Sequence, residues 1–290
     1  MKTHVKIVNA FIDGATGGNP AGVVLNADLL SADQKLQIAA QVGLSETAFI
    51  SKSEVADFKL DFFTSNRQIA HCGHATIATF SYLQQLGKIP NPNTSKETID
   101  GPRKIRMDGE SAFMEQTAPR YIDASQHLDE ILHSLQVNKS DLLHDFQPMV
   151  VNTGNSFMII PLKDKATVKR IQPDSVLIHK LSDIYDLIGF YIFTPDTEIP
   201  GRDAGARMFG PRYSIPEEAA TGMAAGPLAC YLYDIMNIKK ETFLIEQGHW
   251  MPQPSPSIIT VRLELDKSGK IERLFAGGKA SVSREIVIDL

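Results

Sequence analysis

The chain has 290 residues, of which 43% are hydrophobic and 22% charged, and its formal net charge is −5. This length allows one large domain or two of roughly 140 residues, and it buries enough surface to fold without disulfides or a metal ion. Nucleic acid is excluded as the main partner, because no run of five like charges occurs and phosphate binding calls for clustered positive charge. With only Cys72 and Cys230, the chain cannot be a disulfide scaffold.

Targeting signals are absent from the sequence as it stands. The N-terminal segment has neither the apolar stretch nor the small-residue cleavage site of a secretory signal peptide. All apolar stretches are shorter than the roughly 20 residues that a membrane helix needs. We therefore expect a cytoplasmic protein with no membrane partner.

Short runs of β-branched and aromatic residues predict the strands. Segments rich in Gly and Pro separate them, most clearly at residues 13–20. The strands expected in the first half are residues 4–11, 21–25, 47–50, 58–63, 104–107 and 111–116, and short strands are expected later at 191–193 and 206–209.

Two helices are predicted in the first half. One begins after the N-cap Ser31, with Gln34 completing a capping box, and stops at Gly43. The other spans residues 75–86 and stops at Gly87, and it contains no charged residue. A helix without a charged face is typical of a helix that is buried on most sides.

The second half repeats the pattern of the first. Two apolar runs within residues 149–160 flank residues 154–156, as the first two strands flank residues 18–20. A second nearly uncharged helical stretch at 221–232 aligns with residues 72–83. The aligned identities are Gly73 with Gly222, Ala75 with Ala224, Tyr82 with Tyr231 and Leu83 with Leu232. Two anchors in the same order predict a duplicated architecture.

These elements predict an α+β fold with two pseudo-symmetric halves. We expect the first half at residues 1–118, a more polar helical connection at 119–145 and the second half at 146–290. If the halves face each other, the two buried helices point their N-termini, at Gly73 and Gly222, toward one cleft. Helix N-termini bind carboxylates through unpaired N–H groups and partial positive charge.

Candidate proton-transfer groups lie near these helix starts. Glu46 precedes a strand, His74 lies in the first turn of the first buried helix, and Glu218 precedes the second. A partly desolvated carboxylate or a histidine at a cleft suits general acid–base catalysis. Structural interpretations remain open for each: a solvated turn residue for Glu46, a backbone-bonded ring for His74, and first-turn acids for Glu217 and Glu218.

Cys72 lies beside His71 and His74 and invites a metal or thiolate interpretation. Ligands so close in sequence, with no second cluster, are poor zinc geometry, so we expect no metal. Cys230 lies deep in an apolar helix and is predicted to be a packing residue. The sequence contains no Walker loop, dinucleotide-binding fingerprint or Gly-x-Ser-x-Gly elbow.

Six short motifs occur in order along the chain: GNPAGV at 18–23, LSETAF at 44–49, CGHAT at 72–76, RMFGP at 207–211, ATG at 220–222 and GGKA at 277–280. As an ordered set they resemble the PhzF-like (phenazine-biosynthesis-type) isomerase family over essentially the whole chain. The resemblance implies a diaminopimelate-epimerase fold. In that fold each half is a β-barrel-like sheet wrapped around a central helix, and the site lies between the halves.

The resemblance also implies a cofactor-free isomerase that moves a proton between carbons of a small unsaturated or amino carboxylic acid, and a homodimer. The family's catalytic positions fall on Glu46, His74 and Glu218. The substrate-binding positions fall on Asn19, Gly73, Thr221, Gly222 and Met223. Two positions depart from the family pattern, since Glu218 replaces an aspartate and Met223 replaces a serine.

Two alternatives to this isomerase stay open. One is a non-catalytic protein of the same fold that binds a small acid or acts as a scaffold. The other is an epimerase or hydrolase that depends on Cys72. The related epimerases use two facing cysteines, whereas this chain has Ala220 near the partner position.

Overall fold

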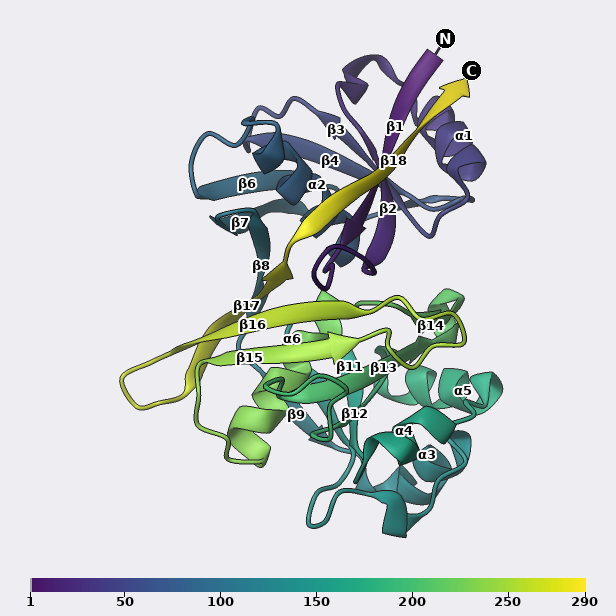
Figure 1. Cartoon of the computed structure of the whole chain (residues 1–290), viewed down its shortest axis with the longest axis vertical. Coiled ribbons are helices and arrows are strands. Elements are labelled where there is room, and N and C mark those ends of the chain that lie inside the picture. The colour runs from purple at the N-terminus through teal and green to yellow at the C-terminus, as the bar shows by residue number, and fades with distance from the viewer. Residues whose placement is uncertain (1) are drawn as a thin grey trace. The chain divides into compact units, whose positions relative to one another are not determined.

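Two units, each with its own strands and central helix, make up the residues 2–290 that the computed structural model describes (Figure 1). The first unit contains the residues up to Glu115 together with Gly277–Leu290, and the second is Gln116–Ala276. The chain therefore passes from the first unit to the second and returns.

The first unit consists of strands around the central helix α2, with a second helix, α1, on the outside. Its strands are β1 (Lys2–Ala10), β2 (Asn19–Val24), β3 (Thr47–Ser51), β4 (Phe58–Phe63), β5 (Gln68–Ile69), β6 (Asn93–Thr98), β7 (Gly101–Asp108), β8 (Ser111–Thr117), which ends in the second unit, and β18 (Ala280–Asp289). Its helices are α1 (Ala32–Val42) and α2 (Gly73–Gln85).

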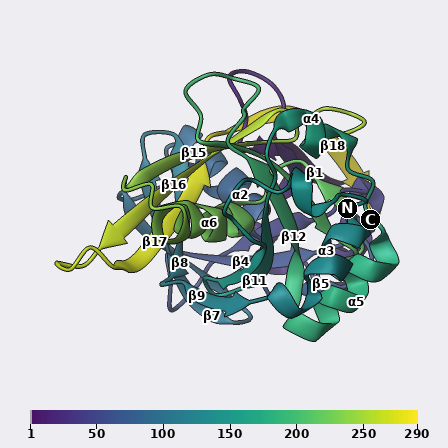
Figure 2. The ribbon, with the colours of Figure 1, turned by 90° about the horizontal axis from the view of Figure 1, so that it is seen from below.

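The second unit has more helices. Its strands are β9 (Arg120–Asp123), β10 (Met149–Asn152), β11 (Ser156–Pro161), β12 (Leu187–Thr194), β13 (Ala204–Gly210), β14 (Ile215–Glu218), β15 (Thr242–Gln247), β16 (Ser257–Leu265) and β17 (Ile271–Gly278). Its helices are α3 (Leu128–Ser134), α4 (Lys165–Arg170), α5 (Ser175–Tyr185) and α6 (Gly222–Cys230), which continues into a π-helical turn at Tyr231–Ile235. Helices α3 and α5 pack against each other, and α5 covers β12 (Figure 2).

Both units follow one strand-pairing scheme. In the first, β1–β2 is antiparallel, β2–β3 parallel, β3–β4 antiparallel, β4–β6 parallel and β6–β7 antiparallel. In the second, β10, β11, β12, β13, β15 and β16 repeat these five senses in the same order. In each unit a short strand, β5 or β14, pairs with the fourth strand of the scheme and leads into the central helix. The duplicated α+β architecture expected from the sequence is confirmed.

The C-terminal strand completes the first unit. β18 pairs antiparallel with β1 along its whole length, from Lys2 opposite Asp289 to Ala10 opposite Ala280. The first and last strands of the described residues therefore lie side by side in the first unit (Figure 1).

The two central helices are buried, as their uncharged sequences predict. Every residue of α2 from Gly73 to Leu83 is buried, and the helix packs against β1, β2, β3 and β18. In α6 every residue except Met223 is buried, and the helix packs against β10, β11 and β16. No helix among residues 2–290 is both long and apolar enough to cross a membrane.

Helix α1 precedes β3 in the chain, and both of its ends have clear capping signals. The Ser31 hydroxyl accepts from the Gln34 backbone N–H and the Gln34 side chain accepts from the Ser31 N–H, so the predicted capping box is present. Gly43 ends the helix in the left-handed region at φ 68°, where glycine is favoured. The inner face of α1, with Ile38, packs into an apolar cluster that includes Phe49 of β3.

Candidate active site

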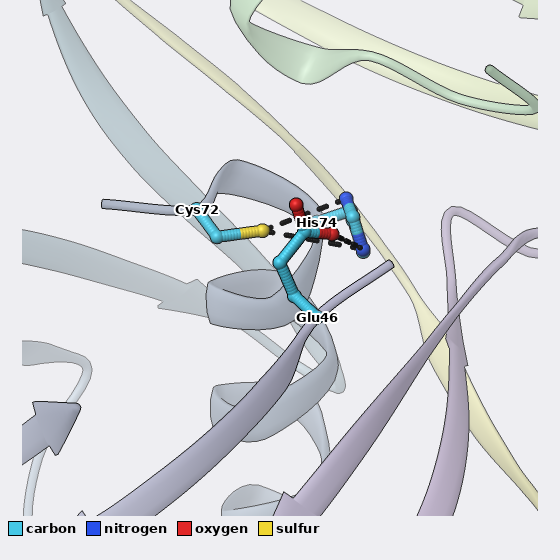
Figure 3. Close-up of side chains that lie close together, drawn as sticks. All are labelled: Glu46, Cys72 and His74. Carbon is cyan, nitrogen blue, oxygen red and sulfur yellow. Dashed lines mark hydrogen bonds and ion pairs between the residues drawn. The ribbon is translucent and has the colours of Figure 1, made fainter. Parts of the chain in front are cut away.

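Glu46, Cys72 and His74 come together in the first unit (Figure 3). Glu46 immediately precedes β3, Cys72 is the N-cap of α2, and His74 lies in the first turn of that helix. The Glu46 Oε2 atom is 3.3 Å from His74 Nε2, and the Cys72 Sγ atom is 3.6 Å from His74 Nδ1. Two of the three catalytic positions expected from the sequence are therefore neighbours.

The backbone fixes Glu46 against the sheet. Its carbonyl accepts a hydrogen bond of 3.0 Å from the Gly22 N–H of β2. Residue 22 is glycine for a steric reason, because a Cβ there would lie 2.6 Å from the Thr47 Oγ1 atom. The close approach of β2 to Thr47 thus anchors the residue that follows Glu46.

The carboxylate of Glu46 is mostly buried, and one of its oxygens accepts no hydrogen bond. The side chains of Glu46 and His74 are 14% and 4% exposed. Glu46 Oε2 is buried and makes no hydrogen bond, because the nearby His74 nitrogen does not have hydrogen-bond geometry toward it. A buried oxygen without a hydrogen bond costs folding free energy, and the charged partner within reach is the His74 ring, which forms an ion pair with Glu46 when it is protonated.

Cys72 is a neutral thiol in this setting. Burial raises the pKa of the Cys72 thiol, the Glu46 carboxylate raises it further, and His74 opposes the shift only in part. Since the thiolate is the nucleophile, a thiol held protonated is a poor one. This environment argues against chemistry that depends on Cys72.

The start of α2 is suited to an anion. Cys72 makes no capping bond with its side chain, and the first N–H groups of a helix, which begins here at Gly73, have no acceptor within the helix. Asn19 is buried at the beginning of β2, at the same end of the parallel β2–β3 pair as Glu46. The site positions predicted in this half therefore gather at one end of the first unit's sheet.

The remaining predicted positions gather in the second unit. Glu218 ends β14, and its carboxylate accepts from the Thr221 hydroxyl. The Gly222 carbonyl accepts from the Gln116 side chain at 2.9 Å. Met223, in the first turn of α6, accepts a weak hydrogen bond on its sulfur from the Asn155 amide at 3.6 Å.

Gln247 is a residue that sequence reasoning missed. Its side-chain oxygen accepts from the Thr221 N–H at 3.0 Å, and its side-chain nitrogen donates to the Glu218 carbonyl at 2.7 Å. The glutamine thus holds both ends of the loop that leads into α6. A single glutamine at the end of a strand carries no sequence signal for this role, because the contact depends on the β13–β15 pairing.

Glu217 has a structural role. Both of its carboxylate oxygens accept from the Arg207 guanidinium, at 2.8 and 2.9 Å, in a bidentate pair. Arg207 also donates to the backbone carbonyls of Val168 and Ile171 at the end of α4. Glu217 is therefore committed to linking β13, β14 and α4, whereas its neighbour Glu218 faces Thr221.

The donor atoms of Glu46, Cys72 and His74 lie within 4.8 Å of one another, a spacing that a metal ion can bridge. The set fits such an ion only in part. Zinc binds cysteine as the thiolate, whereas burial and Glu46 both raise the pKa of Cys72.

Comparisons with known proteins agree with one another. The family model described as phenazine biosynthesis-like protein (PhzC-PhzF) matches residues 8–285. An uncharacterized isomerase of Clostridium acetobutylicum is 31% identical over 305 aligned positions that cover 99% of each chain. The trans-2,3-dihydro-3-hydroxyanthranilate isomerase of Pseudomonas chlororaphis is 30% identical over 79% of each chain. The crystal structure of a PhzF-family phenazine biosynthesis protein of Bacillus anthracis has a TM-score of 0.91 at 26% identity, over all of both chains.

Proposed function

The chain belongs to the phenazine biosynthesis-like (PhzF) family and is an isomerase, and we propose that it moves a proton between two carbons of a small unsaturated or amino carboxylic acid without a cofactor. The observation that carries this proposal is the buried Glu46 Oε2, which makes no hydrogen bond and lies 3.3 Å from His74 Nε2. A carboxylate in this position is an available general base.

In the proposed reaction Glu46 takes a proton from a substrate carbon. The electron pair left behind is delocalised into the adjacent unsaturated or carboxyl system, and the double bond shifts. Glu46, or His74 acting in its place, then returns the proton to a second carbon. The proton count is unchanged, so the product is an isomer and the step needs no oxidant or reductant.

Substrate-binding positions are proposed at the start of each central helix. In the first unit, the Gly73 N–H at the start of α2 would bind the substrate carboxylate, and Asn19 is buried at the start of β2. In the second unit, the proposed positions are Thr221 and Gly222, and Gln247 holds their loop in place. Met223 offers an apolar side chain and a backbone N–H, so we propose that an apolar part of the substrate lies against it.

The test is proton exchange from D₂O, followed by proton NMR. The substrates are trans-2,3-dihydro-3-hydroxyanthranilate, the acid named for the Pseudomonas relative, and a panel of small unsaturated and amino acids. Glu46→Gln should fold normally and lose at least about 10²-fold in rate. The matched control is Glu54→Gln, the same change at an exposed position of the first unit, which should keep the wild-type rate.

Two outcomes would count against the proposal. Equal rates for wild type and Glu46→Gln would remove Glu46 as the base. Binding of a panel member with no exchange by the wild-type protein would favour the non-catalytic binding protein.

A further inference from the structure

Lys96 of β6 is buried in the first unit, and no carboxylate among the described residues forms an ion pair with its ammonium group. Its side chain is 0% exposed, and no carboxylate of residues 2–290 pairs with it. The Nζ atom donates to Thr76 Oγ1 at 2.6 Å and lies 3.1 Å from His71 Nδ1. It also lies 4.9 Å from the centroid of the Phe62 ring. Burying an ammonium without a counter-ion costs folding free energy, whereas an apolar side chain would gain it.

The contacts of Lys96 converge on the segment that carries the candidate site. The Thr76 hydroxyl, which accepts from Lys96, itself donates to the Cys72 carbonyl at 2.6 Å. Lys96 is therefore linked to the Cys72 carbonyl through the Thr76 hydroxyl. It also contacts His71, the residue before Cys72. Cys72 is the N-cap of α2, and His74 follows it by two positions. One buried side chain thus holds the chain on both sides of the N-cap.

The internal repeat supplies a comparison for this position. Lys96 pairs with Phe58, the first residue of β4, and its counterpart Ile245 pairs with Ala204, the first residue of β13. Ile245 is fully buried. The same place in the same architecture is therefore filled by an apolar residue in the second unit, so the fold itself does not require a cation there.

In the second unit, a different polar residue holds the segment that precedes the central helix. Gln247 lies two positions after Ile245, on the same face of β15, and ties the Glu218–Thr221 loop to that strand. In both units a polar side chain from the strand that follows the central helix holds the segment before that helix. In the first unit the residue is Lys96.

The electrostatic surroundings are consistent with this role. Burial lowers the pKa of Lys96 to about 7, and the Arg103 charge on β7 lowers it too, while Cys72 acts in the opposite direction. Burial, Lys96 and Arg103 together lower the pKa of His71 to about 2. His71 is therefore neutral, and its Nδ1 atom accepts from Lys96 while its proton resides on Nε2.

We propose that Lys96 is a positioning residue that fixes His71 and the Cys72 carbonyl, and through them the place of the His74 ring beside Glu46. Its effect on the reaction rests on the proposed function. Its effect on His74 does not, and can be measured without substrate.

The experiment compares two buried lysines of the first unit. Lys35 is 8% exposed and forms an ion pair with Asp61 at 2.5 Å, whereas Lys96 has no carboxylate partner. Lys96→Met should keep or raise the Tm and shift the NMR signals and titration of His71 and His74. Lys35→Met should lower the Tm, because it leaves the Asp61 carboxylate unpaired, and should leave the His74 signals unchanged. Lys96→Ile, which copies Ile245, is the second variant.

The readouts are thermal unfolding, NMR of protein labelled at histidine, and the exchange rate in D₂O. With a substrate that wild type turns over and Glu46→Gln does not, Lys96→Met should lower kcat by about 10-fold and leave KM within about twofold. Unchanged His74 signals in both Lys96 variants would overturn the inference, and so would a fall in Tm without a shift of His74. If Glu46→Gln kept full activity while His74 shifted in Lys96→Met, the proposed function would fail and the inference about Lys96 would stand.

Discussion

Within the candidate site, three side chains with different protonation chemistry share a small buried volume. Glu46 keeps an oxygen without a hydrogen bond, Cys72 is a protonated thiol, and the His74 ring lies between them. In the proposed reaction, the carboxylate and the imidazole transfer the proton. The thiol fills space beside the ring.

Replacing the thiol should therefore be tolerated. Cys72→Ser, which keeps the size of the side chain, should retain activity within about threefold of wild type, because the rate scale of a general acid or base is about 10² or more. Steady-state rates on the same substrate check this. A loss of about 10²-fold in Cys72→Ser, with an unchanged Tm, would instead support the thiol-dependent epimerase.

The buried lysine makes a prediction about pH and stability. The pKa of Lys96 is lowered from 10.5 to about 7 in the folded chain, so between pH 7 and 10.5 the unfolded chain binds more protons and stability rises with pH. Below pH 7 both states are protonated, and the cost of burying the charge is constant. Lys96→Met removes this dependence, so its Tm should exceed that of wild type most clearly at pH 6, and the difference should shrink toward pH 10.

Thermal unfolding of wild type and Lys96→Met at pH 6, 7, 8.5 and 10 measures that difference. A difference in Tm that stays constant across these values would contradict the lowered pKa of Lys96. His71, whose pKa is lowered to about 2, contributes a separate rise of stability between pH 2 and 6.5, and this rise should be smaller in Lys96→Met because the Lys96 charge is one cause of the lowered pKa.

Some residues of the candidate site could be predicted from the sequence and others could not. Glu46 and His74 could be chosen because each stands beside a recognisable local signal, a strand start and a helix start. Lys96 and Gln247 could not be chosen in this way. Their contacts form only when β4 pairs with β6 and β13 pairs with β15, and no local signal predicts those pairings. The pairing of Glu217 with Arg207 depends in the same way on the β13–β14 hairpin.

Among the elements, the contact between β2 and β3 has the most direct bearing on the site. A Cβ added at Gly22 would meet the Thr47 side chain at 2.6 and 2.9 Å, and Thr47 follows Glu46. Gly22→Ala should therefore destabilise the protein by about 1–3 kcal/mol, as overpacking does, and should lower activity by displacing Glu46.

The rescue variant for this prediction is Gly22→Ala/Thr47→Ala. The Thr47 hydroxyl is buried and makes no hydrogen bond, so removing it opens space without losing a polar contact. Urea unfolding and exchange rates should show partial recovery of both stability and activity. A double variant no better than the single one would show that Gly22 matters for another reason.

Local sequence signals predicted several elements of the first unit correctly. The capping box at Ser31 and the stop at Gly43 predicted α1 to the residue, and the strands expected at 47–50 and 58–63 correspond to β3 and β4. Helix α2 begins at Gly73, two residues before the expected start, because Cys72 caps it without a side-chain signal. The final strands had no local marker, and β18 finds its partner β1 at the far end of the chain.

For the molecule as a whole, duplication was the most informative inference. Four identities between two helical stretches and one matched pair of turns pointed to two related units, and the five repeated pairing senses confirm that relationship. The family assignment from ordered motifs agrees with the match over residues 8–285. The homodimer, the cytoplasmic location, the domain boundaries and the absence of a cofactor stay predictions.

The most direct test of the central claim is deuterium incorporation into substrate carbon, because it detects the proton transfer itself. Wild type, Glu46→Gln and Glu54→Gln are each mixed in D₂O with the dihydro-hydroxyanthranilate and the acid panel, and proton NMR follows each carbon-bound signal. We expect deuterium incorporation or a shifted double bond with wild type and Glu54→Gln, and at least about 10²-fold slower change with Glu46→Gln. Exchange at the wild-type rate in Glu46→Gln would contradict it.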